Sequence, residues 1–296
     1  MSHFTVLVIG DDPERQLAPY HEFECTGEND EYVQDVDITA EVQEQIAKHG
    51  MLEGLSYYGL EGKVVPSEAL VDRSDTHKYG YAVVKDDKLV KAVDRTNPNK
   101  KWDWYVLGGR WTGYLTLKSG CKGEIGKPGA MTQAAEHGKV DAARKRDIDF
   151  TAIRDEAERK ARARYQRFSS LLEDRPLPKS WPAIRAEHEG DIDAAREAYH
   201  AQPGIRAIQK DDELRWADDP GAEFGCTEDR HAERAREGAI STFAVVKDSK
   251  WFEKGSMGWW GCVADEKDQD AWNREFSKLL DSVSEDTLLS VYDCHI

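Results

Sequence analysis

Short apolar segments recur in two well-separated parts of the chain, each bounded by residues that favour turns. Residues 4–9 form an apolar run rich in β-branched side chains that stops at Gly10-Asp11-Asp12-Pro13, which predicts a buried strand followed by a turn. Residues 79–117 contain several such segments, interrupted by Asp86-Asp87 and Gly108-Gly109, and these close breaks favour an antiparallel β-meander. The strands expected in it span 81–85, 88–93, 102–107 and 111–117.

A helical period replaces these short segments in the middle of the chain. Apolar residues at spacings of three and four predict a long helix over 148–172. They are Phe150, Ile153, Ala157, Ala161, Tyr165, Phe168 and Leu172. Shorter helices are expected over 38–49, 192–200, 205–216 and 266–281. Further strands are expected over 20–25, 243–247, 250–253 and 287–292.

These elements predict an α+β fold, in which N- and C-terminal segments form a mainly antiparallel sheet core around a largely helical central insertion. We expect an N-terminal α/β lobe with a β-meander over 1–130 and a charged helical insertion over 131–237. A C-terminal hairpin, helix and strand over 238–296 would then return to the core. Residues 81–88 and 243–250 agree at six of eight positions, which reflects either a duplication or a chance similarity between two hairpins.

Charge is unevenly distributed along the chain. The protein has 57 acidic and 41 basic residues among 296, a net charge of −16, and residues 1–60 alone contribute −11. Such a segment either attracts a basic partner or simply forms a solvated surface. The balance argues against a protein that coats nucleic acid, because that affinity comes from neutralising phosphates. No apolar run approaches the roughly 18 residues of a membrane span, and residues 4–9 are too short for a signal peptide, so we expect a cytosolic protein.

Motifs of common enzymes do not occur in the sequence, which contains no GxxxxGK[ST], GxGxxG, HExxH or GxSxG. Asp11 and Asp12 follow the first strand, where carboxylates hold Mg²⁺ in some enzymes, although an Asp-Asp-Pro turn explains them without chemistry. With His21 and the cysteines they support the alternative of a metal-dependent hydrolase acting on nucleotides. A zinc site would need a fold that brings together Cys25, Cys226, Cys262 and Cys294. Because the catalytic motifs are missing, we expect no catalytic residues and no cofactor, and because local ligand spacing is missing, we expect no metal.

Aromatic residues gather beside the predicted strands. Tryptophan next to arginine is typical of the centre of a protein interface, although core packing or base stacking would also account for such a cluster. The candidate interface residues of this group are Trp102, Trp104, Arg110, Trp111, Trp259 and Trp260. Gly108-Gly109-Arg110 would also bring backbone amides toward an anion, or simply form a hairpin.

The predicted long helix supplies a second group of candidates. It carries basic side chains, and Arg162 and Arg164 are the candidate interface residues among them. A basic helix of this kind contacts nucleic acid or an acidic partner, or it pairs with carboxylates of its own chain. We favour pairing within the chain, because the sequence has a surplus of carboxylates.

Five segments of the sequence resemble one family of phage proteins. They are MSHFTVLVIG at 1–10, QLAPYHEFECTG at 16–27, WDWYVLGGRWTG at 102–113, MGWWGC at 257–262 and YDCHI at 292–296. The family is that of the bacteriophage anti-Gabija proteins. The resemblance runs from one end of the chain to the other, but residues 130–237 contribute nothing to it.

The resemblance implies a non-enzymatic inhibitor. Members of this family bind the Gabija complex of bacteria, a nuclease joined to a helicase-like subunit, assemble as oligomers around it, and block DNA engagement and cleavage. We therefore expect a homo-oligomer in the cytoplasm of the infected host, with the Gabija complex as partner and with no direct contact to nucleic acid or membrane.

Overall fold

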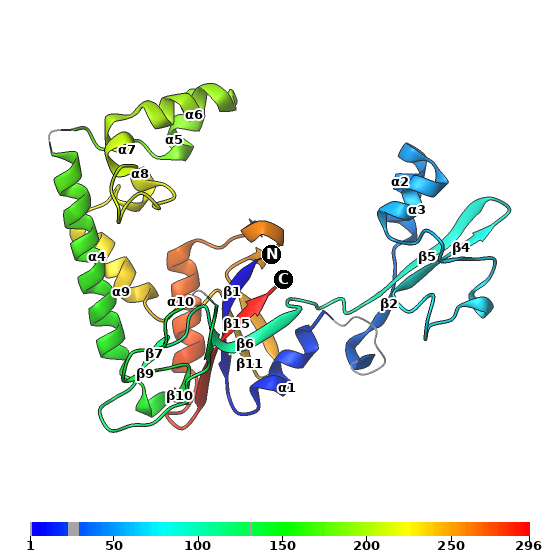
Figure 1. The fold of residues 1–296 in the computed structure, drawn as a ribbon, viewed down its shortest axis with the longest axis horizontal. Helices are drawn as coiled ribbons and strands as arrows, with labels where there is room; N and C mark the ends of the chain where they lie inside the picture. The colour runs from blue at the N-terminus through cyan, green and yellow to red at the C-terminus, as the bar shows by residue number, and fades with distance from the viewer. Residues whose placement is uncertain (1, 23–29, 131, 174) are drawn as a thin grey trace.

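The computed structural model describes residues 2–22, 30–130, 132–173 and 175–296. Its main sheet has the strand order β12-β11-β1-β15-β6-β8. At its centre, β1 (His3–Ile9) runs antiparallel to β15 (Leu288–His295), from the pair His3 and His295 to the pair Ile9 and Leu289. The two chain ends therefore lie side by side (Figure 1), as expected for a sheet core built from N- and C-terminal segments.

The remaining strands extend this sheet on both sides. On one side β1 pairs in parallel with β11 (Ala244–Lys247), which forms a hairpin with β12 (Lys250–Glu253). On the other side β15 pairs with β6 (Trp104–Gly109), which continues in parallel with β8 (Lys127–Pro128), while β10 (Ala142–Arg144) pairs with the start of β15. The α+β prediction is confirmed, and the sheet is mixed rather than purely antiparallel.

Both faces of the main sheet are covered. Along β1 the side chains alternate between the faces, so Leu7 and Ile9 join one core while Phe4, Val6 and Val8 join the other. The first core is closed by α10 (Gln269–Asp281), whose Trp272 is 1% exposed and donates its indole N–H to the Thr242 carbonyl at 2.8 Å. The second is closed by α1 (Pro13–Leu17).

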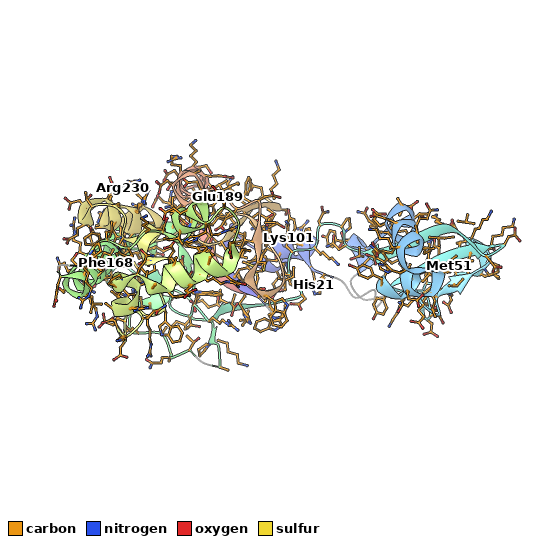
Figure 2. All side chains as sticks on the ribbon, turned by 90° about the horizontal axis from the view of Figure 1, so that it is seen from above. His21, Met51, Lys101, Phe168, Glu189 and Arg230 are labelled. Atoms are coloured by element: carbon orange, nitrogen blue, oxygen red, sulfur yellow. The ribbon has the colours of Figure 1, made fainter. Side chains whose placement is uncertain are left out.

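Residues 30–96 form a separate unit, the arm. Its sheet has the order β2-β5-β4-β3, and α2 (Thr39–His49) and α3 (Met51–Tyr57) supply the apolar side chains that pack against it. The strands are β2 (Gln34–Asp37), β3 (Val64–Val65), β4 (Gly80–Lys85) and β5 (Lys88–Thr96). Figure 1 shows the arm extending away from the main sheet, and Figure 2 places Met51 far from Phe168 and Arg230.

The β-meander expected over residues 79–117 is divided between these two sheets. Antiparallel pairing of β4 with β5 is as expected, but β6 pairs with β15 in the main sheet and not with β5. The cause is the segment between them, where the buried side chain of Asn97 donates to the carbonyls of Pro19 at 2.9 Å and His21 at 2.8 Å. These bonds fix the connection between the arm and the main body, by which we mean residues 2–22 and 102–296.

Two further strand predictions are wrong in extent. The strand expected over 111–117 is reduced to β7 (Leu115–Thr116), which pairs with β9 (Lys139–Val140). Of the strand expected over 20–25, His21 makes a single bridge to Trp102, and residues 23–25 lie outside the described residues. The long-helix prediction is confirmed, because α4 (Phe150–Leu172) begins after Asp149, whose carboxylate accepts from the Ala152 amide at 2.9 Å.

The other helices of the insertion follow α4. They are α5 (Trp181–Glu187), α6 (Ile192–Ala201), α7 (Pro203–Ile208), α8 (Pro220–Glu223) and α9 (Glu228–Gly238). The rings of Phe168 and Phe224 stack with centroids 4.2 Å apart, which joins α4 to the residue after α8. The helix expected over 205–216 is shorter, since α7 ends at Ile208. In the described part of the chain, none of the helices has the length and apolar composition needed to span a bilayer.

The two similar octapeptides form two equivalent hairpins in different sheets. Both central residues of each turn have positive φ, Asp86 and Asp87 in one hairpin and Asp248 and Ser249 in the other. This geometry belongs to the type I′ turn, which Asp tolerates better than most residues. In each case the first strand also pairs in parallel with a third strand, β3 in the arm and β1 in the main sheet. The sequence similarity therefore reports a shared local structure.

Candidate interaction site

The predicted interface residues lie in three places. Trp104 and Trp260 belong to the end of the main sheet where β1 begins and β15 ends. Arg110 and Trp111 follow β6 at its other end. Arg162 and Arg164 lie on α4 in the helical insertion. The structure therefore does not bring all the candidates into one surface.

Two histidine–aspartate pairs occupy the end of the sheet beside Trp104. His3 Nδ1 lies 2.8 Å from Asp293 Oδ1, and His295 Nδ1 lies 2.7 Å from Asp103 Oδ1, so each ring donates to a carboxylate. The two imidazole rings meet edge to face with centroids 4.9 Å apart. The Trp104 ring lies 6.1 Å from that of His3 and is 49% exposed. This arrangement combines oriented polar groups with an exposed indole, as protein-binding surfaces do.

The sequence analysis missed all four of these polar residues. Their signal is weak but readable, since Asp293 and His295 are two positions apart on a strand and therefore share a face. His3 is opposite His295 in the register of β1 and β15. The pairing of β1 with β15 brings these groups together, and no local sequence motif predicts that pairing.

Gly108 and Gly109 curl the chain back over Asp293. Both have positive φ, and a Cβ on Gly109 would lie 2.4 Å from the Asp293 side chain, so only glycine fits. The Arg110 amide then donates to Asp293 Oδ2 at 2.9 Å. Buried Asp141 accepts from the Gly113 amide at 2.6 Å. Of the amides that the sequence suggested for an external anion, that of Arg110 therefore binds a carboxylate of the same chain.

Trp260 is presented to solvent by a short, well-anchored loop. The loop connects β13 (Ser256–Met257) with β14 (Val263–Ala264). Ser2 Oγ donates to the Gly258 carbonyl at 2.8 Å and accepts from the Gly261 amide at 2.7 Å. Trp260 itself has φ 63° and is 81% exposed. A large aromatic side chain on a left-handed backbone, held outward by tertiary hydrogen bonds, is poorly explained by stability alone.

The other tryptophans of this group differ in their exposure. Trp102 is 5% exposed and stacks on His21 with centroids 4.4 Å apart, so it belongs to the second core of the main sheet and is not part of the exposed surface. Trp111 is half-buried. The side chain of Trp259 lies outside the described part of the structure. Of the predicted aromatic candidates, Trp104 and Trp260 are the exposed ones among the described side chains.

Arg162 and Arg164 are paired within the chain, as the sequence analysis favoured. Arg162 lies 2.8 Å from Asp229 and 3.1 Å from Glu158. Arg164 lies 2.7 Å from Glu223, which raises the pKa of its guanidinium, and its guanidinium lies 5.7 Å from the centre of the Phe224 ring. These arginines hold the helices of the insertion together, and their charge is largely neutralised.

The residues considered for metal chemistry have structural partners or are far apart. Asp12 caps α1, and Asp11 lies 2.8 Å from Arg144. Cys294 is fully buried in the core, where burial raises the pKa of its thiol, while Cys262 is exposed in the Trp260 loop. Cys25 lies outside the described residues. Within those residues, no cluster of three or more histidine, cysteine or acidic side chains is placed to hold a metal ion.

The acidic residues of the N-terminal 60 are divided between the main body and the arm. Asp35 in the arm lies 2.5 Å from Arg73 and 3.0 Å from Arg95, which come later in the chain. Glu22 lies 2.7 Å from Lys100. The negative charge that the sequence concentrates in one segment is thus partly compensated in space.

The comparisons with known proteins add no relative. No family model matches the chain, and no curated protein or solved structure shows significant similarity to it.

Proposed function

We propose that this chain is a non-enzymatic phage inhibitor that binds and encloses the Gabija nuclease–helicase complex of the host bacterium and blocks DNA binding and cleavage. One observation carries the proposal. Four of the segments that resemble anti-Gabija proteins, at 1–10, 102–113, 257–262 and 292–296, each contribute residues to the end of the main sheet where β1 begins and β15 ends. Strand pairing brings these distant segments together, and this shared place supports a common binding surface.

The contacts between these segments are specific. Ser2 binds the Trp260 loop, His3 binds Asp293, and His295 binds Asp103. Each bond joins two of the four segments. Residues from four of the resembling segments therefore fix the positions of the two exposed tryptophans, Trp104 and Trp260, which supports a partner-binding role for this surface.

The elongated shape supports an inhibitor that surrounds its partner. The arm projects from the main body and exposes large apolar side chains, Leu52 at 61%, Tyr57 at 73% and Leu70 at 62%. We propose that the arm contacts another copy of the chain, so that a homo-oligomer closes around the complex in the host cytoplasm. The paired arginines of α4 support inhibition without direct contact to DNA.

Co-purification with tagged Gabija subunits tests the function. The wild-type chain should co-elute with the complex and suppress its DNA cleavage. Trp260→Ala should weaken binding by about 2 kcal/mol, roughly thirtyfold, because a central interface tryptophan is lost. Trp216→Ala is the matched control, since Trp216 is 77% exposed but lies in the helical insertion, and it should bind as the wild type does.

The outcomes separate the partner from the surface. If the wild type neither co-elutes nor inhibits cleavage, the proposed function is wrong. If the wild type binds and both tryptophan variants bind equally well, the partner is right and the surface is wrong. For the arm, Tyr57→Asp should lower the mass measured by light scattering, and a wild type that is monomeric at every concentration contradicts the oligomer.

A further inference from the structure

A groove lies between α9, α10 and the N-terminal half of α4, and it shares no lining residue with the end of the main sheet that carries Trp104 and Trp260, here called the Trp260 surface. Its volume is about 610 Å³, within the usual range for small-molecule sites. Its lining includes Arg154 from α4, Arg230 and Arg236 from α9, and Asn273, Arg274 and Lys278 from α10. Figure 2 shows Arg230 at the end of the molecule opposite the arm.

The three carboxylates that line this groove all lie near Arg230, and Glu237 is the most distant of them at 3.8 Å. Glu233 lies 2.7 Å from Arg230, and Asp270 lies 2.9 Å from the same guanidinium. Arg236 pairs with Asp155 and Glu158 of α4.

Three cations in the groove remain without a counterion. Within the described residues, Arg154, Arg274 and Lys278 have no carboxylate partner. Arg154 is half-buried, and a cation that loses hydration gains most from a fixed anion. The chain has 57 acidic and only 41 basic residues, so carboxylates are plentiful, yet none of them pairs with these three cations within the described residues. This favours an anion that comes from outside the chain.

Asn273 adds a second, independent signal at the same groove. Its side chain is 4% exposed, and its Oδ1 accepts from Gln269 Nε2 at 2.9 Å. Its Nδ2 is buried and has no hydrogen-bond partner among the described residues. Leaving such a donor unpaired costs about 1–3 kcal/mol. Gly238 of α9 packs against this amide, and a Cβ there would lie 3.2 Å from Nδ2.

We propose that this groove binds a small phosphate-bearing molecule. Arg154, Arg274 and Lys278 neutralise the phosphate, and Asn273 Nδ2 donates to an acceptor atom of the ligand. Positive charge that is not balanced within the site suits a dianion, and arginine donors match phosphate oxygens. The site shares no residue with the Trp260 surface, so it stands independently of the proposed function.

Isothermal titration of the full chain with inorganic phosphate, pyrophosphate and adenosine monophosphate (AMP) tests the proposal. Sodium chloride at equal ionic strength is the reference. Binding of at least one probe is expected, and Arg154→Gln and Arg274→Gln should each weaken it about tenfold. Asn273→Leu should weaken AMP, which carries further acceptor atoms, more than inorganic phosphate. Arg159→Gln is the matched control, because Arg159 is exposed on the same helix outside this groove and should leave binding unchanged.

Three results would overturn the proposal. One is the absence of binding by all three probes at millimolar concentration. Another is an equal loss of binding in Arg159→Gln and Arg154→Gln, which would mean that the anion binds unspecifically. The third is binding of poly-glutamate, weakened by Arg154→Gln, in a chain that ignores the small phosphates, because the groove would then take an acidic polypeptide. Circular dichroism of each variant confirms that the fold is retained.

Discussion

The arginines of α4 fall into two groups that the sequence does not distinguish. Arg164 and Arg167, in the second half of the helix, lie 2.7 Å from Glu223 and Asp211, respectively. Arg154, near its beginning, has no carboxylate partner within the described residues and faces the groove with Arg274. The same residue type on one helix therefore stabilises the insertion at one end and leaves free positive charge at the other.

The difference arises from what packs against each half of the helix. The partners of the paired group come from the segments around α8, about 45–60 residues later in the chain, which fold back along α4. Near the beginning of the helix, Arg274 and Lys278 of α10 approach Arg154 instead. Tertiary packing decides which arginines are neutralised, and helical spacing alone carries no information about it.

The largest expected loss of stability comes from disrupting the packing around the second half of α4, where the arginines are paired. Phe224 is 1% exposed, stacks on Phe168 and lies beneath the Arg164 guanidinium. Phe224→Ala should lower the free energy of unfolding by about 3 kcal/mol, because it opens a cavity and removes the stacked ring. Urea denaturation measures it, and Phe224→Leu should cost less. A loss below about 1 kcal/mol for the alanine variant would mean that this cluster does not hold the insertion.

The fold was predictable wherever a single element carries its own pattern. The apolar stripe of α4 and the run at β1 are local signals, and both elements form as expected. The division of β4, β5 and β6 between two sheets was not predictable, because it depends on Asn97 binding carbonyls 76–78 residues earlier in the chain. Strand propensity indicates that a strand exists, while its sheet is chosen by contacts of this kind.

The candidate site was predictable only in part for the same reason. Tryptophan beside arginine named Trp104 and Trp260 as candidates, but the same signal also named Trp102, which is buried in the core. His3 and Asp293 become neighbours through the pairing of the first and last strands, which no spacing along the chain reveals. Asp293 also accepts from the Arg110 amide and Asp141 from the Gly113 amide, so these two donors of the loop are not free to bind an external anion.

Replacing one arginine of each group by alanine compares their contributions to stability directly. Arg164→Ala should cost about 1 kcal/mol, because the half-buried pair with Glu223 and the contact with Phe224 are both lost. Arg154→Ala should stay within about 0.5 kcal/mol of the wild type, since no ion pair is broken. Urea denaturation at neutral pH measures both. Equal losses would show that the two groups play the same structural role.

The smallest expected effect is the pH dependence of stability, which should differ between the paired and the unpaired arginines of α4. The Arg167 guanidinium lowers the pKa of Asp211 to about 2, from its ordinary value of 3.8. The ion pair therefore contributes its full stability above about pH 4, and this contribution is lost as the pH falls from there toward 2. The difference in urea midpoint between the wild type and Arg167→Met should be constant from pH 7 to 5 and shrink from pH 4 to 3.

Arg274→Met is the matched control, because no carboxylate pairs with Arg274 within the described residues. The difference in urea midpoint between Arg274→Met and the wild type should therefore not change with the titration of Asp211. A difference for Arg167→Met that stays constant to pH 3 would contradict the pairing with Asp211 and place Arg167 in the same group as Arg154.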